Sequence, residues 1–228
     1  MNMNSPAITT ARRALGISRT YIVGAVFMAV FAITVWGNVM YVGTDRGTPL
    51  LALPLDMIPL LVMATPVVML FVYDKNNGVL EYALSLGMTQ RDIYMRYLKA
   101  TLLLTFVFSI IFAPAVLAFT YVTQGAGTVA TILPIPLLAI PFSLCIAAFM
   151  VTAMMAFSSL QKTRVGSNQP LGLMVGWLIT IPAYLVPLIF SFEDAIYADL
   201  VIAAIIAAVV FIFLRSSGKL IRREKFLP

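Results

Sequence analysis

The stretch that decides the fold is DKNNGVLEYALSLGMTQRDIYMRYLK, which covers Asp74–Lys99. It is the longest polar interruption in a chain that is strongly apolar on both sides of it. Its pattern predicts a short helix that is closed at both ends, followed by the start of a second helix that continues into an apolar segment. The apolar segments are the expected body of the protein, and this stretch is the expected part outside that body.

The short helix has a start signal and a stop signal. Asn76 or Asn77 can accept hydrogen bonds from the free backbone amides at its start, and Gly87 can supply the left-handed residue that ends it. Most of the residues between them are apolar, whereas Glu81 and Ser85 lie four positions apart and share a narrow polar stripe. Such a helix must bury its apolar sides, either at a membrane interface or in a hydrophobic groove of a partner.

The second helix is expected to begin at Thr89. Asp92 follows three residues later, close to the reciprocal arrangement of a capping box, although Asp is shorter than the usual Glu or Gln. The helix then continues into the apolar segment Leu98–Tyr121. We therefore expect a push on the short helix to reach this segment through one continuous rod.

The composition predicts a membrane-embedded protein. Of the 228 residues, 61% are hydrophobic and 11% are charged, whereas a soluble domain has about 45–50% apolar and about 25% charged residues. Little polar sequence is left for a soluble domain, so a single transmembrane domain over 1–228 is expected. The net charge of +6 lies in short segments between apolar runs, which indicates contact with a lipid bilayer and not with nucleic acid.

Six apolar runs are long enough to cross a bilayer, which takes about 20 residues each. The expected fold is an all-α polytopic membrane protein with six transmembrane helices and a short helix in the interface, carrying Arg12 and Arg13, before the first span. The six expected spans are Tyr21–Val42, Leu50–Tyr73, Leu98–Tyr121, Pro134–Leu160, Leu171–Phe190 and Ile196–Leu214. Almost all Lys and Arg residues fall on one side of these spans, so both termini are expected in the cytoplasm.

The side chains of the chain exclude several kinds of chemistry. There is no histidine, which argues against His-ligated metal sites and His general bases. The single cysteine, Cys145, cannot form a disulfide within the chain. No Gly-x-x-x-x-Gly-Lys-Ser/Thr loop is present, so we expect no ATP binding by that route and no enzymatic activity in this chain. Asp56 is the one carboxylate well inside a predicted span, where a structural or pathway role is expected.

The segment GVLEYALSLGMTQRDIYMRYLKA resembles the first cytoplasmic loop of ABC type-2 permeases, the membrane subunits of type V ABC exporters. The likeness rests on the Gly-x-Leu-Glu core at Gly78–Glu81, on the turn at Leu86–Thr89 and on Arg91 before the next span. ARRAL at Ala11–Leu15 is similar to the N-terminal interfacial helix of that family. The chain departs from the family at Gly87, where many members have proline in the turn.

The resemblance implies that the short helix is the coupling helix, which docks on a separate cytoplasmic ABC ATPase subunit. ATP and Mg²⁺ would then bind to that partner, and this chain would carry no cofactor or metal. A second permease copy, identical or related, would complete the complex in the plasma membrane. The residues that the resemblance places at the ATPase contact are Gly78, Leu80, Glu81, Ser85, Gly87 and Arg91.

Other functions stay open on the sequence alone. A secondary transporter would need ionisable groups near the middle of the membrane, and Asp56 is the lone candidate. An intramembrane enzyme would need a catalytic constellation that a chain without histidine and with few carboxylates hardly offers. A structural subunit of a membrane complex is a further alternative.

Overall fold

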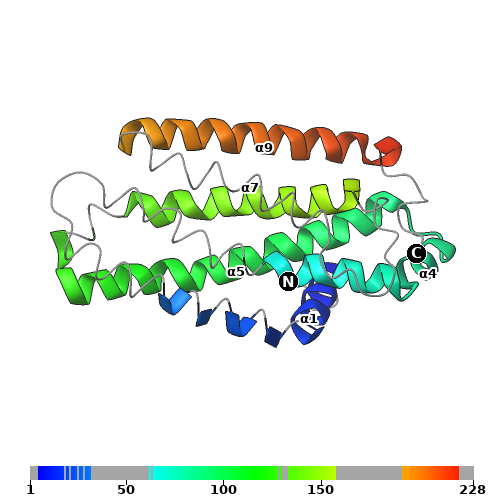
Figure 1. Cartoon of the computed structure of the whole chain (residues 1–228), viewed down its shortest axis with the longest axis horizontal. Coiled ribbons are helices and arrows are strands. Elements are labelled where there is room, and N and C mark those ends of the chain that lie inside the picture. Colours follow the sequence, from blue (N-terminus) through cyan, green and yellow to red (C-terminus); the bar gives the residue numbers. More distant parts are fainter. Residues whose placement is uncertain are drawn as a thin grey trace.

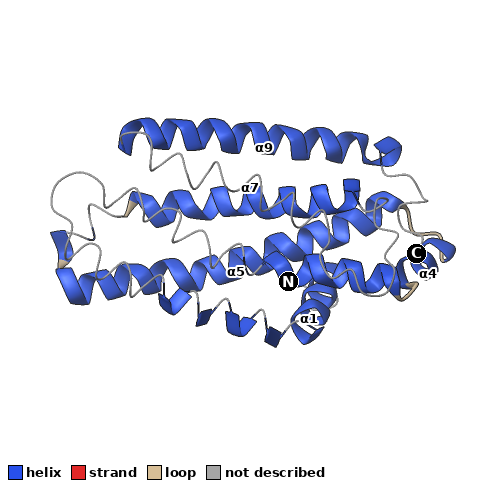
Figure 2. Cartoon of the chain, in the orientation of Figure 1, coloured by secondary structure: helices blue, strands red, loops and turns tan. Residues whose placement is uncertain are grey.

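The computed structural model describes residues 5–17, 19–20, 22–24, 26–27, 29–31, 62, 64–127, 129, 133–157 and 192–220. All regular structure in these residues is helical, and Figure 2 shows no strand among them. The predicted all-α class is therefore confirmed for this part of the chain. Residues 64–76 form one of the helices, and the labelled helices are α1 (Pro6–Ile17), α4 (Val79–Ser85), α5 (Gln90–Gln124), α7 (Pro134–Phe157) and α9 (Phe192–Leu220).

The long helices α5, α7 and α9 lie side by side with their axes roughly aligned, and α5 runs antiparallel to α7 (Figure 1). Helix α7 packs against both α5 and α9, and α5 also contacts α9 and α1. Helix α1 crosses near the start of α5, and its axis differs by 84° from that of the helical segment Ile22–Phe31. The short helix α4 sits at the same end of the bundle as the first turns of α5 (Figure 1). One end of the bundle therefore gathers α1, α4 and the beginning of α5.

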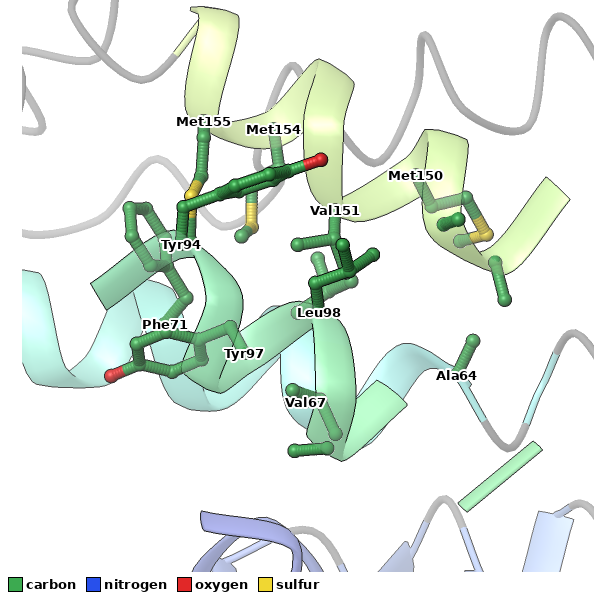
Figure 3. Close-up of a cluster of buried hydrophobic side chains, with 14 of the residues drawn as sticks. Ala64, Val67, Phe71, Tyr94, Tyr97, Leu98, Met150, Val151, Met154 and Met155 are labelled. Atoms are coloured by element: carbon green, nitrogen blue, oxygen red, sulfur yellow. The ribbon is translucent and has the colours of Figure 1, made fainter. Parts of the chain in front are cut away.

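The core at this end is built around Tyr94, a fully buried residue of α5. Its hydroxyl shares a hydrogen bond of 2.7 Å with the hydroxyl of Thr152 on α7. Its ring meets the ring of Phe213 on α9 edge to face, with the centroids 5.3 Å apart, an arrangement that aromatic pairs favour. Figure 3 shows Leu98 of α5 and Val151 of α7 pointing toward each other beside this tyrosine. Tyr94 therefore ties three long helices together.

Helix α5 is the best candidate for a membrane span among the described residues. The helical stretch Gln90–Thr123 has 34 residues and is long and apolar enough to cross a bilayer, by length and composition. Helix α1 and Ile22–Phe31 pass the same test as a bent pair. The described residues thus support one span, or two if the bent pair counts as one, and they do not support six.

Four of the other expected spans lie partly or wholly outside the described residues, whereas Ile196–Leu214 lies within α9. Two of the expected spans coincide with α7 and α9. The apolar parts of these helices, Ala139–Met155 and Ala204–Arg215, have only 10–17 residues each, fewer than the about 20 residues that a span needs. The expected span Leu98–Tyr121 lies within α5, as predicted. The spans mainly or entirely outside the described residues are Tyr21–Val42, Leu50–Tyr73 and Leu171–Phe190.

The second expected span ends at Tyr73, within a helix that extends beyond it. The helix continues to residue 76, and Asp74 and Lys75 lie on it as buried residues. An ion pair with α1 compensates the buried Asp74 carboxylate, which allows polar residues to remain in a packed helix. Burial lowers the pKa of Lys75, because desolvation disfavours its charged form.

Candidate functional site

Two glycines with positive φ fix the limits of α4. Gly78 precedes it with φ 70° and Gly87 follows it with φ 84°. At the end of the helix, the amide of Gly87 donates to the carbonyl oxygen of Leu84 at 3.1 Å, and the amide of Met88 donates to that of Ala83 at 3.2 Å. These two bonds form a Schellman motif, so the predicted role of Gly87 is confirmed.

The prediction that Asn76 or Asn77 caps the start of α4 is wrong. The residue before the helix is Gly78, which makes no side-chain cap. The side-chain amide of Asn77 instead donates to the carbonyl oxygen of Tyr73 at 2.8 Å. Asn77 therefore closes the preceding helix, because the last carbonyl groups of that helix also need partners.

Replacing Gly87 with Ala is expected to loosen the end of α4. A Cβ atom at this position would meet no heavy atom within 4 Å, so the penalty is the left-handed backbone alone, about 1–2 kcal/mol for a residue other than glycine. Amide hydrogen exchange at Leu86–Met88 should become about 5–30-fold faster. Gly16→Ala is the control, because Gly16 lies within α1, is equally uncrowded and should gain helix propensity. Unchanged exchange in Gly87→Ala would show that the turn does not depend on glycine.

Helix α4 has an inner side and an outer side. Leu80 is 2% exposed and anchors the inner side in the core. Glu81, Tyr82, Ser85 and Leu86 are all exposed, and Tyr82 and Leu86 are each 66% exposed. These four residues occupy positions i, i+1, i+4 and i+5, which fall on one side of a helix. We call this set the outer face of α4; it combines a carboxylate, a hydroxyl and two large apolar groups.

A capping box joins α4 to α5. The hydroxyl of Thr89 accepts from the amide of Asp92 at 3.1 Å, and the carboxylate of Asp92 accepts from the amide of Thr89 at 3.2 Å and from its hydroxyl at 2.6 Å. The predicted reciprocal cap is therefore confirmed despite the shorter Asp. The hydrogen bond from the Thr89 hydroxyl, followed by that from its amide, lowers the pKa of Asp92. The cap is consequently formed at neutral pH and is lost as the pH falls through that lowered pKa.

A buried carboxylate on the 64–76 helix connects three segments. Asp74, whose side chain is 1% exposed, accepts hydrogen bonds from both terminal nitrogens of Arg13 on α1, at 2.6 and 3.2 Å. It also accepts from the hydroxyl of Tyr97 on α5 at 2.5 Å. The Tyr97 ring packs edge to face on Phe71, with centroids 5.3 Å apart. We call Arg13, Asp74 and Tyr97 the Asp74 cluster.

The Asp74 cluster holds α1 against the two helices that flank α4. Its bidentate Arg–carboxylate geometry is the strong form of ion pair, but the Arg13 side chain is 45% exposed, so solvent screening weakens the pair. Sequence reasoning placed Arg13 in an interfacial helix and treated Asp74 as the start of a polar loop. An acidic residue directly after an apolar run was a signal for a buried partner, but the sequence does not identify that partner.

The site residues expected from the sequence gather at one end of the bundle. Gly78, Leu80, Glu81, Ser85 and Gly87 lie on α4 or next to it, and Arg91 is exposed in the first turn of α5. Asp56 lies outside the described residues. Within the described part of the chain, no three His, Cys, Asp or Glu side chains gather where they could hold a metal ion.

Comparison with protein-family models, with curated proteins and with solved structures finds no match to this chain.

Proposed function

We propose that this chain is the membrane permease subunit of an ABC exporter, and that α4 is the helix on which a separate cytoplasmic ATPase docks. In this proposal six helices cross the plasma membrane, both termini lie in the cytoplasm, and a second permease copy completes the transport path. ATP and Mg²⁺ bind to the ATPase. The proposal joins the likeness of Gly78–Ala100 to ABC type-2 permeases with the exposure of α4.

The outer face of α4 is the observation that carries the proposal. A seven-residue helix is too short to be stable by itself in water, and Leu80 anchors it to the bundle. Tyr82 and Leu86 nevertheless stay exposed beside Glu81. Exposed aromatic and aliphatic groups next to a charge are typical of an interface core with a polar rim. A partner with an apolar groove and a cationic edge fits this face.

The surface of α5 supports a membrane location for the bundle. In its most apolar stretch only 33% of the residues are buried within the protein, whereas a core helix of a soluble protein is mostly buried. Phe106, Val107, Ile110 and Ile111 are 47–64% exposed on this helix. Lipid is the natural environment for such a surface, and Ile205 and Phe211 give α9 the same character.

The joint between α4 and α5 explains how docking would reach the membrane. Four residues, Leu86–Thr89, separate α4 from α5, and both sides of this turn are fixed by hydrogen bonds. A displacement of α4 by the ATPase would therefore be passed to α5, because no flexible linker lies between the two helices. The Asp74 cluster attaches α1 to the same unit, so α1 would follow the movement.

Purification of the chain from its native membrane tests the proposal. A tagged, full-length protein extracted in mild detergent should retain a protein with a Gly-x-x-x-x-Gly-Lys-Ser/Thr loop, identified by mass spectrometry. The ATPase activity of that protein should change at least severalfold when the two are reconstituted in vesicles. An unrelated six-span protein with the same tag is the control. Recovery of the intact chain without any nucleotide-binding partner, under conditions that preserve other ABC complexes, would contradict the proposal.

A further inference from the structure

Several buried serine and threonine hydroxyl groups of the described helices are satisfied within their own helix. Those of Thr101, Ser109 and Thr120 each donate to the carbonyl oxygen four residues earlier, at 2.7–3.0 Å. Because this bond uses only the backbone of the same helix, such a hydroxyl needs no partner on another helix. It therefore adds no specific contact between helices.

Thr105 on α5 and Ser143 on α7 differ from this pattern. Both residues are fully buried, and among the described residues theirs are the two buried polar side-chain atoms without a hydrogen-bond partner in the protein. A buried hydroxyl without a partner is unfavourable, and native proteins satisfy such groups with another side chain or with an ordered water molecule.

The two hydroxyl-bearing residues lie at the same depth of the bundle. Helices α5 and α7 are antiparallel neighbours, and Leu98 faces Val151 across them in Figure 3. Thr105 lies seven residues after Leu98 and Ser143 lies eight residues before Val151. At about 1.5 Å per residue, the two positions are about 10.5 and about 12 Å from that pair, so their levels agree within about 2 Å.

Both residues also lie on inward-facing sides of their helices. Seven residues make nearly two turns, so Thr105 shares the face of Leu98, which packs against α7. Ser143 in the same way shares the face of Met150, which is fully buried and turned toward Ala64 in Figure 3. The two unsatisfied hydroxyls thus lie at similar levels on sides of α5 and α7 that face the interior of the bundle.

We propose that Thr105 and Ser143 together bind one water molecule between α5 and α7. Each hydroxyl makes a hydrogen bond to the water, which joins the two helices. A hydroxyl is both donor and acceptor, so two of them match the bonding of a single water. The inference stands on the packing of α5 against α7 alone and does not depend on transport or on an ATPase.

Cross-linking tests the proximity that the proposal needs. In a Cys145→Ala background, the pair Thr105→Cys and Ser143→Cys should react with a short bifunctional thiol reagent at least tenfold more completely than a control pair. The control combines Ser143→Cys with Phe106→Cys, because Phe106 is the next residue of α5 and is 47% exposed on a different side. Equal cross-linking of the two pairs would overturn the proposal.

A double-mutant cycle tests whether the two hydroxyls share one partner. Thr105→Val and Ser143→Ala should each lower the melting temperature of the purified chain by about 2–4 °C. The double variant should lose no more than the larger single loss, because no unsatisfied hydroxyl is left behind. Ser109→Ala is the control, since Ser109 bonds to its own helix. Additive losses would overturn the proposal, whereas a density peak between both hydroxyls in an experimental map would establish the water.

Discussion

Replacing Asp74 with Ala is expected to lower the melting temperature of the purified protein by roughly 5–15 °C. The carboxylate is 1% exposed and accepts three hydrogen bonds, two from Arg13 and one from Tyr97. Its removal leaves the buried Tyr97 hydroxyl without that acceptor and frees Arg13 from the 64–76 helix. Loss of one partner of a buried pair costs about 3–5 kcal/mol.

The exposure of Arg13 reduces this figure. Because its side chain is 45% exposed, the guanidinium can turn to water, and we expect about 2–4 kcal/mol for Asp74→Ala. For a chain of this size each kcal/mol corresponds to about 2–4 °C. Tyr97→Phe removes one of the three hydrogen bonds and should have a smaller effect of the same sign.

A double-mutant cycle separates the ion pair from general damage. Arg13→Ala combined with Asp74→Ala should lose clearly less stability than the two single losses together, because the second change removes a contact that is already broken. Arg12→Ala is the matched control: Arg12 is the neighbouring exposed arginine of α1 and should change the melting temperature by less than about 2 °C. Additive losses would show that the Asp74 cluster does not act as a unit.

The features that could be predicted from the sequence are those set by neighbouring residues. Gly87 ends α4 and Thr89 with Asp92 starts α5 because each of these motifs closes within a few residues. The continuation of α5 from its cap into the apolar segment Leu98–Tyr121 could be predicted for the same reason. The failed cap at Asn77 shows the limit of local reasoning, since its side-chain NH2 group donates to the carbonyl oxygen of Tyr73 in the preceding helix and its oxygen does not cap α4.

The features that could not be predicted depend on contacts between distant residues. Arg13 and Asp74 are 61 positions apart, and nothing in either local pattern pairs them. The outer face of α4 is a second case. The sequence indicates that its apolar residues need burial, but only the packing of Leu80 decides that Tyr82 and Leu86 remain outside. The site is thus a local motif placed by non-local contacts.

Changes on the outer face of α4 are expected to uncouple the chain from the proposed ATPase without unfolding it. Tyr82→Ala should weaken binding of the ATPase by about 30-fold, since an aromatic side chain at the centre of an interface contributes about 2 kcal/mol or more. The melting temperature of the isolated chain should change by less than about 2 °C, because the side chain is 66% exposed. Binding is measured by titration of the ATPase onto the chain in lipid nanodiscs.

Tyr121→Ala is the matched control for this change. Tyr121 is also a tyrosine, is 61% exposed and lies on α5, near the end of that helix that is far from α4 (Figure 1). Its removal should leave ATPase binding and the stimulation of ATP hydrolysis unaltered. Equal losses from Tyr82→Ala and Tyr121→Ala would mean that exposed aromatic area in general, and not α4, determines binding.

Glu81→Lys separates the charge of the outer face from its apolar part. The reversed charge should weaken binding at low salt and lose most of this effect at 1 M salt, where the screening length falls to about 3 Å. The effect of Tyr82→Ala should persist at high salt, because burial of apolar area is not screened. If both variants bind the ATPase as the unaltered chain does, α4 is not the docking helix. If only Glu81→Lys does so, the groove on the partner is apolar and lacks the cationic edge.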